Sequence, residues 1–214
     1  QLLMTFGEVI REPFKKKATV FKLSLSRAAQ TLYPKHNSFN GIKLISHANV
    51  FGRDKLDPGA DFLLQHIDKF PQANNVADLC CGSGILGLKY ASLNNITSVD
   101  FFDESFMATQ SAKVSWQQNF ENTPANFYWD DGLSQKEDQM YDLIICNPPF
   151  HEQHTIGDHI AKRLFKDAQR CLNQQGHLIV VGNRHLAYKQ TLKKYFKQVE
   201  SLACNAKFDL LKCS

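Results

Sequence analysis

The chain has 214 residues, of which 43% are hydrophobic, 21% charged and 11% aromatic. This composition is typical of a globular domain and excludes an intrinsically disordered chain, while the apolar runs fall far short of the roughly 20 residues that cross a bilayer. The formal net charge of +4 divides into +6 over residues 1–50, −7 over residues 51–183 and +5 over residues 184–214. We therefore expect no membrane segment, and two basic ends that either bind a polyanion or form solvated faces.

The first 44 residues differ in pattern from the rest of the chain. They predict a short helix ahead of a lysine run, a strand within residues 19–25 and a polar turn region at residues 34–41. The positive charge of the N-terminal segment follows its apolar part, which is the reverse of a secretory signal peptide. We interpret residues 1–44 as a linker and the tail of a missing N-terminal domain, and residues 45–214 as the catalytic domain.

From Asp57 onward, strands and helices alternate, and Asp57 with Pro58 marks the start of the first helix. Such alternation predicts a Rossmann-like, doubly wound α/β fold with a mostly parallel sheet of seven strands. The last two strands are joined by only four residues, so they must form an antiparallel hairpin. The predicted strands are 76–80, 96–102, 126–129, 141–146, 177–181, 199–203 and 208–213, and the later helices are 87–93, 105–120, 158–172 and 186–196.

A glycine-rich turn follows the first of these strands in the sequence VADLCCGSGILG, residues 76–87. Gly82 and Gly84 let the backbone approach a ligand closely at the carboxyl end of the strand. Together with Gly87 they spell GxGxxG, so a dinucleotide site is one alternative. Asp78, just before the turn, would repel a pyrophosphate but can accept hydrogen bonds from a cationic ligand. This favours S-adenosylmethionine as the cofactor.

Two carboxylates follow the next two strands. Asp103 lies nineteen residues after Gly84 and can accept hydrogen bonds from both ribose hydroxyls, although it is also suited to cap the next helix. Asp100 competes for the ribose role, but its place within the strand makes Asp103 preferable. Asp131 can reach an adenine amino group with its side chain or through the adjacent backbone, a role that Asp130 could also fill, unless the pair is a plain turn.

A buried strand ends in the sequence LIICNPPFH, residues 143–151. Pro148 and Pro149 stiffen the backbone and leave its carbonyls free to accept hydrogen bonds. The Asn147 side-chain oxygen and the Pro148 carbonyl can together hold a planar amino group while Phe150 stacks on its ring. Such a cradle aligns a weakly nucleophilic nitrogen with a methyl donor, which indicates an amino methyltransferase.

Metal binding is not indicated by the remaining histidines and cysteines. The run HEQH, residues 151–154, is one residue short of the HExxH zinc pattern, and the six cysteines contain no CxxC pair. Buried free thiols in a reducing cytoplasm explain the cysteines best. His151 and His154 instead suit closing the active-site loop, contacting the target base or structural hydrogen bonds.

Basic side chains flank the same strand ends. Arg53, Arg184 and His185 either contact RNA phosphates or belong to a solvated surface.

Several segments carry a family resemblance over residues 45–213. The segments NPPFHEQH, IGDHIAKRLFKDAQRCL, VVGNRHLAY and FDLLKC, with HANVFGRDKLDPGADFLLQHI at the entry, resemble the bacterial large-subunit ribosomal RNA guanine-N2 methyltransferases. The related small-subunit enzymes share NPPFH but lack the second histidine and the NRHL segment. The chain departs from the family motif DxGxGxG at Cys80, which stands where the first glycine is expected. This substitution bears on how tightly the turn fits the cofactor.

The resemblance implies a class I methyltransferase that transfers a methyl group from S-adenosylmethionine to the exocyclic N2 of a guanine in 23S ribosomal RNA. It implies protein-free or partly assembled RNA as the partner, a cytoplasmic location, and neither a metal nor a membrane partner. The alternatives are another amino substrate (16S ribosomal RNA guanine, DNA adenine or protein glutamine), an inactive cofactor-binding or RNA-binding fragment, and a nicotinamide oxidoreductase.

Overall fold

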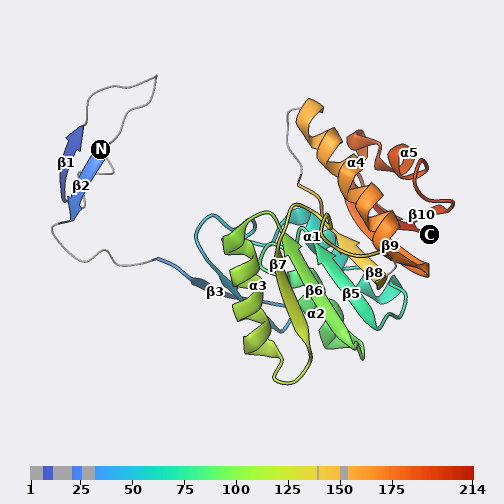
Figure 1. Ribbon diagram of the computed structural model, residues 1–214, viewed down its shortest axis with the longest axis horizontal. Coiled ribbons are helices and arrows are strands. Elements are labelled where there is room, and N and C mark those ends of the chain that lie inside the picture. The colour runs from blue at the N-terminus through green and yellow to red at the C-terminus, as the bar shows by residue number, and fades with distance from the viewer. Residues whose placement is uncertain (1–6, 12–20, 26–31, 139, 150–153) are drawn as a thin grey trace. The chain divides into compact units, whose positions relative to one another are not determined.

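The computed structural model describes residues 7–11, 21–25, 32–138, 140–149 and 154–214, which Figure 1 draws in colour. The chain forms two compact units, residues 1–33 and residues 34–214. Within the first unit, strands β1 (Gly7–Arg11) and β2 (Phe21–Leu25) pair in antiparallel fashion. The strand predicted within residues 19–25 is therefore confirmed. The helix predicted ahead of the lysine run is wrong over residues 7–11, because their backbone pairs with β2.

The second unit contains a seven-stranded sheet with the strand order β10-β11-β9-β8-β5-β6-β7. Strands β5 to β9 run parallel, and β11 is antiparallel to both β9 and β10. The mostly parallel sheet and its C-terminal hairpin are confirmed. The strands are β5 (Asn75–Leu79), β6 (Ser98–Asp103), β7 (Ala125–Trp129), β8 (Tyr141–Cys146), β9 (Leu172–Asn183), β10 (Val199–Cys204) and β11 (Phe208–Cys213).

Helices cover the sheet on both faces, so two apolar clusters form. Helices α1, α2 and α3 pack on one face against side chains that include Val76, Val181 and Leu143, while α4 and α5 pack on the other against Ile144 and Val180. Alternate side chains of one strand thus serve opposite faces, as strand geometry requires. The helices are α1 (Pro58–Leu64), α2 (Ile85–Leu93), α3 (Phe106–Asn119), α4 (His154–Cys171) and α5 (Tyr188–Leu192), with 3₁₀ turns η2 (Ile67–Lys69) and η3 (Arg184–Leu186).

The entry to the second unit is a hairpin of β3 (Lys35–Phe39) and β4 (Ile42–Ser46). The polar turn region predicted at residues 34–41 is thus a strand over most of its length, because its polar side chains alternate with half-buried positions and its backbone pairs with β4. Buried serines of α3 anchor β4 and the residue after it, since Ser115 Oγ accepts from the Ile45 N–H and Ser111 Oγ accepts from the His47 N–H, both at 2.9 Å.

The predicted element boundaries shift most at three places. Helix α4 begins at His154 rather than residue 158, and β9 extends beyond the predicted residues 177–181 at both ends. The helix predicted at 186–196 is reduced to the short α5, because Ala187, which separates α5 from η3, has a left-handed φ of 50°. All six cysteines are free thiols, and none of the described helices is long and apolar enough to cross a membrane.

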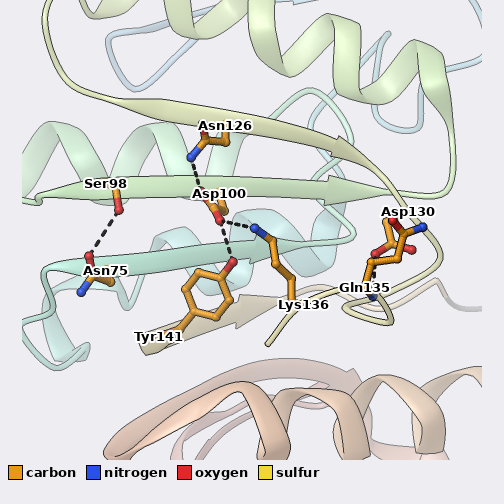
Figure 2. A network of polar contacts seen from close by, with 8 residues as sticks. All are labelled: Asn75, Ser98, Asp100, Asn126, Asp130, Gln135, Lys136 and Tyr141. Atoms are coloured by element: carbon orange, nitrogen blue, oxygen red, sulfur yellow. Dashed lines mark hydrogen bonds and ion pairs between the residues drawn. The ribbon is translucent and has the colours of Figure 1, made fainter. Parts of the chain in front are cut away.

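A buried polar network joins β6, β7 and β8 (Figure 2). The Asp100 carboxylate on β6 accepts hydrogen bonds from Asn126 Nδ2 at 2.8 Å and from Tyr141 Oη at 2.6 Å, and pairs with Lys136 Nζ at 3.2 Å. Although burial alone would lower the pKa of Lys136, its contacts with Tyr128 and Asp100 raise it. Asp100 therefore joins β6 to β7, to β8 and to the segment between β7 and β8.

We expect Tyr141→Phe to lower the free energy of unfolding by about 2 kcal/mol, because the buried Asp100 carboxylate loses a hydrogen bond. Urea unfolding measures the change. Tyr195→Phe is the matched control, since no hydrogen bond of the Tyr195 hydroxyl is found within the described part of the chain. Equal effects of the two substitutions would contradict the role given to the network.

Candidate functional site

A cavity of about 320 Å³ lies at the carboxyl ends of the central parallel strands, and we refer to it as the first cavity. Its walls come from the glycine turn after β5, the ends of β6, β7 and β8 with the segments that follow them, residues 49–60 and the middle of α4. In open α/β sheets this edge is where ligands bind. A volume of this size is sufficient for a nucleoside-sized ligand.

The glycine turn forms one wall of the first cavity. Cys80, Gly82 and Gly84 all have left-handed backbones, with φ values of 62°, 55° and 85°. Glycine adopts such angles without strain, whereas Cys80 is held there at a cost of about 1 kcal/mol. Hydrogen bonding with the Cys146 thiol, together with burial, raises the pKa of Cys80, so its thiol is neutral. The turn keeps its left-handed form although one glycine of the family motif is replaced.

Asp78 lies beneath the turn and is absent from the described residues that line the first cavity. It is fully buried, and its Oδ2 accepts a hydrogen bond from the Gly87 N–H at 2.8 Å. Burial raises the pKa of Asp78 to about 8 against the opposing effect of that hydrogen bond, and the charge of Asp103 raises it further. The structure thus shows Asp78 Oδ2 holding α2 against β5, while its buried Oδ1 has no partner in the described part of the chain. The expected contact of Asp78 with a cationic ligand stays a prediction.

Asp103 lines the first cavity, whereas Asp100 belongs to the buried network of Figure 2. The Asp103 carboxylate accepts hydrogen bonds from the Gly82 N–H at 2.9 Å and the Ser105 N–H at 2.8 Å. Each oxygen keeps a lone pair for a further donor. Burial raises the pKa of Asp103, opposed by these hydrogen bonds. The cap of α3 is Ser105 and not Asp103.

Asp130 and Asp131 both line the first cavity after β7. The Asp131 carboxylate forms a bidentate ion pair with Arg163 of α4. More than half of the Asp131 side chain is exposed. The Asp130 carboxylate accepts from Ser134 Oγ at 2.8 Å. With both carboxylates engaged by neighbouring side chains, the backbone of this segment is the better candidate for contact with a ligand.

The segment after β8 supplies Asn147, Pro148 and Pro149 to the first cavity. The Asn147 Nδ2 donates to Asp57 Oδ2 at 3.0 Å, and this bond fixes the amide so that Oδ1 faces the other way. The Oδ1 atom is buried and has no partner in the described part of the chain. A buried carbonyl oxygen without a donor is unfavourable unless a ligand supplies one. Phe150 and His151 lie outside the described residues.

Asp57 was predicted only as a helix cap, and its second role was missed. Its Oδ2 accepts from the Ala60 N–H at 2.9 Å, which confirms the cap, and from Asn147 as well. The second contact joins residues 90 positions apart, so no local pattern could have indicated it. Only the recurrence of this segment in the family resemblance signalled that it belongs to the site.

A second cavity, of about 820 Å³, adjoins the first and shares Phe51 and Asp57 with it. The predicted RNA contacts Arg184 and His185 line this second cavity. Arg53 lines neither cavity and pairs with Asp54 at 3.4 Å. His154 is the first residue of α4, and its side chain lies outside the described part of the structure. Of the five basic residues predicted to contact RNA, the structure therefore brings Arg184 and His185 to one place, while the side chains of His151 and His154 lie outside the described part.

Comparison with known proteins matches residues 41–212 to the methyltransferase small domain family. The chain is 45% identical over 171 residues to the ribosomal RNA large subunit methyltransferase G of Pseudomonas aeruginosa, covering 80% of this chain and 46% of that protein. A Pseudomonas putida protein of the same name is 41% identical over 210 residues, covering 96% and 56%. The chain thus spans about half the length of the relatives it matches.

Solved structures share the fold. A 16S rRNA N2 methyltransferase from T. thermophilus, solved in complex with AdoMet and guanosine, has a TM-score of 0.75 and 21% identity, covering 98% of this chain and 58% of that one. The ribosomal protein L11 methylase of Lactobacillus delbrueckii subsp. bulgaricus has a TM-score of 0.59 and 21% identity, covering 72% and 77%.

We expect the stability of the chain to fall between pH 4 and pH 8 through Asp78. The folded state keeps the Asp78 proton up to a pKa of about 8, whereas the unfolded chain releases it near the ordinary value of 3.8. The contribution is complete below pH 4 and is lost as the pH rises towards 8. Asp78→Asn should remove this dependence while keeping an acceptor for Gly87, as measured by urea unfolding from pH 5 to 8.

Asp142→Asn is the control for this measurement. Although partial burial raises the pKa of Asp142, hydrogen bonds from Asn75, Asn173 and Asn74 lower it overall, so its contribution is lost only in acid. Its stability profile should run parallel to that of the unmodified chain from pH 5 to 8. A parallel profile for Asp78→Asn as well would contradict the role of Asp78.

Proposed function

Because this chain belongs to the methyltransferase small domain family, we propose that it transfers a methyl group from S-adenosylmethionine to the exocyclic N2 of a guanine in 23S ribosomal RNA. The observation that carries the proposal is the unpartnered Asn147 Oδ1, which is held by Asp57 beside the first cavity. The names of the relatives support a large-subunit RNA substrate. The guanosine and AdoMet in the T. thermophilus structure support the chemistry.

The first cavity suits S-adenosylmethionine, which would supply an electrophilic methyl group when bound. The left-handed turn at Cys80, Gly82 and Gly84 leaves room for close backbone approach. The free lone pairs of Asp103 can accept from ribose hydroxyls, and the backbone beside Asp131 can accept from the adenine amino group. Asp78 contributes indirectly, because it anchors the helix that follows the turn.

Positioning supplies most of the catalysis in this proposal. Asn147 Oδ1 and the Pro148 carbonyl accept the two N–H groups of the guanine amine, so that the nitrogen lone pair faces the methyl donor. Positive charge develops on the nitrogen as the new bond forms, and the Asn147 oxygen stabilises it. The amine then loses a proton to water or to His151, and no strong base is needed.

A paired guanine cannot enter such a site, so the substrate is an unstacked or flipped base, with Phe150 replacing part of the lost stacking. Protein-free or partly assembled 23S RNA in the cytoplasm meets this requirement best. Arg184 and His185 beside the second cavity would contact the flanking RNA. Arg53 and His154 are candidates for further RNA contacts.

The test is methyl transfer from labelled S-adenosylmethionine to protein-free 23S and 16S RNA in separate reactions, followed by nucleoside analysis. N2-methylguanosine from 23S RNA alone supports the proposal. Transfer to 16S RNA alone, a different methylated nucleoside or no transfer to either RNA would overturn it for this chain.

Asn147→Ala and Asp103→Ala should have opposite effects. We expect Asn147→Ala to lower the transfer rate about a hundredfold with cofactor affinity nearly unchanged, since it removes an acceptor for the reacting amine. Asp103→Ala should mainly weaken cofactor binding, because it removes a ribose acceptor and frees Gly82. Single-turnover kinetics and calorimetry with S-adenosylmethionine separate the two effects, and equal loss of both by Asn147→Ala would contradict its role.

Two substitutions of Asp57 separate its cap from its contact with Asn147. Asp57→Ser keeps a side-chain cap for α1 but is too short to reach Asn147, so we expect the transfer rate to fall about tenfold. Asp57→Asn keeps an oxygen for both bonds and should stay closer to the unmodified rate. The melting temperatures of both variants should lie within a few degrees of that of the unmodified chain. Equal methyl-transfer rates for the two variants would exclude the positioning role of Asp57.

A further inference from the structure

The second cavity is a separate compartment beside the methyl-transfer site. Its walls are the end of β9, the 3₁₀ turn η3, the turn between β10 and β11, and the start of α1. It adjoins the first cavity at Phe51 and Asp57, which line both. Because Asp57 also holds the Asn147 amide, the second cavity opens next to the atoms that we propose hold the target amine.

Asn183, the last residue of β9, lines the second cavity with an unsatisfied acceptor. Its Oδ1 atom is buried and has no hydrogen-bond partner in the described part of the chain. Asn183 precedes η3 in the position of a cap, yet its side chain makes no capping hydrogen bond. The usual structural use of an asparagine at this position is therefore missing, and a buried carbonyl without a donor is unfavourable unless a ligand supplies one.

Sheet geometry brings Asn183 and Asn147 to the same side of the same edge. Cys146 of β8 pairs with Val180 of β9, so Asn183 lies two residues further along its strand than Asn147 does. With a strand spacing of about 4.8 Å and a rise of about 3.3 Å per residue, the two Cα atoms are about 8 Å apart. Side chains along a strand point alternately to the two faces of the sheet. By this alternation Asn183 lies on the same face as Val181, and Asn147 lies on that face too, which is the face that α1 covers.

Charged and aromatic groups around the second cavity suit a nucleotide. The Arg184 side chain is more than half exposed, pairs with Asp209 at 3.8 Å and donates to the Asn205 carbonyl at 3.4 Å, while Lys207 Nζ lies 5.1 Å from the Phe208 ring centroid. Phe51, at the boundary between the two cavities, is 69% exposed, which is unusual for a phenylalanine. Guanidinium and ammonium groups attract phosphate, and an exposed ring stacks on a base.

We propose that the second cavity binds the target guanine and that Asn183 Oδ1 accepts its N1–H, so that Asn183 determines base specificity. This inference rests on the proposed function. A guanine carries adjacent donors at N1 and N2, which match the acceptors Asn183 and Asn147. Adenine carries an acceptor at N1, which would face the Asn183 carbonyl and be repelled. A base with an amino group at C2 but without a donor at N1 should therefore bind poorly.

The experiment compares guanosine with 2-aminoadenosine, which has the C2 amino group but an acceptor at N1. Binding of each nucleoside is measured by calorimetry in the presence of S-adenosylhomocysteine. The unmodified chain should prefer guanosine by about tenfold or more, and Asn183→Ala should lose most of that preference by weakening guanosine binding alone. Transfer to 23S RNA should fall to a similar extent, with cofactor affinity unchanged.

Thermal unfolding distinguishes this role from a structural one, because removal of an unsatisfied carbonyl should leave the melting temperature of Asn183→Ala equal or higher. Asn94→Ala is the matched control, since Asn94 donates to the Tyr90 carbonyl at the end of α2 and lines neither cavity. An unchanged preference in Asn183→Ala, or equal weakening of both nucleosides, would overturn the inference. Absence of N2-methylguanosine with the unmodified chain would instead overturn the proposed function.

Discussion

The Asp57 carboxylate joins parts of the chain on which both cavities depend. One oxygen accepts from the Ala60 N–H at the start of α1 and from the Asn147 amide after β8. The first bond fixes the start of α1, which packs on one face of the sheet. The second bond fixes the direction in which the Asn147 carbonyl points. Asp57 also lines both cavities. One side chain therefore determines the orientation of the Asn147 carbonyl, the packing of α1 and the boundary between the first and second cavities.

Patterns that are local in the chain could be predicted from the sequence. The order of strands and helices, the hairpin at the C-terminus and the Asp57 cap all follow from periodicity and from residues next to one another. That Asp103 faces a cavity and Asp100 does not could also be predicted, since the last residue of β6 can face a cavity, whereas one within the strand is enclosed by neighbouring strands. The ribose contact of Asp103 stays a prediction.

The features that were missed depend on contacts between distant residues. Strand β3 has a polar sequence and forms because β4 pairs with it, and the break before α5 depends on the backbone of Ala187. The unsatisfied carbonyls of Asn147 and Asn183 become visible only when all their possible donors are placed in space. Asp78 shows the same limit, because its sequence context does not indicate that its Oδ2 accepts from the Gly87 N–H.

The C-terminal hairpin gives the two cavities separate origins in the chain. The first cavity is built by segments between residues 44 and 164, whereas the second takes most of its wall from Asn183, η3 and the turn before Phe208. Among the described residues, the two cavities share only Phe51 and Asp57. Substitutions in the last thirty or so residues can therefore change the shape of the second cavity without altering the first cavity. A fold divided in this way can diversify what it recognises while its reaction chemistry stays constant.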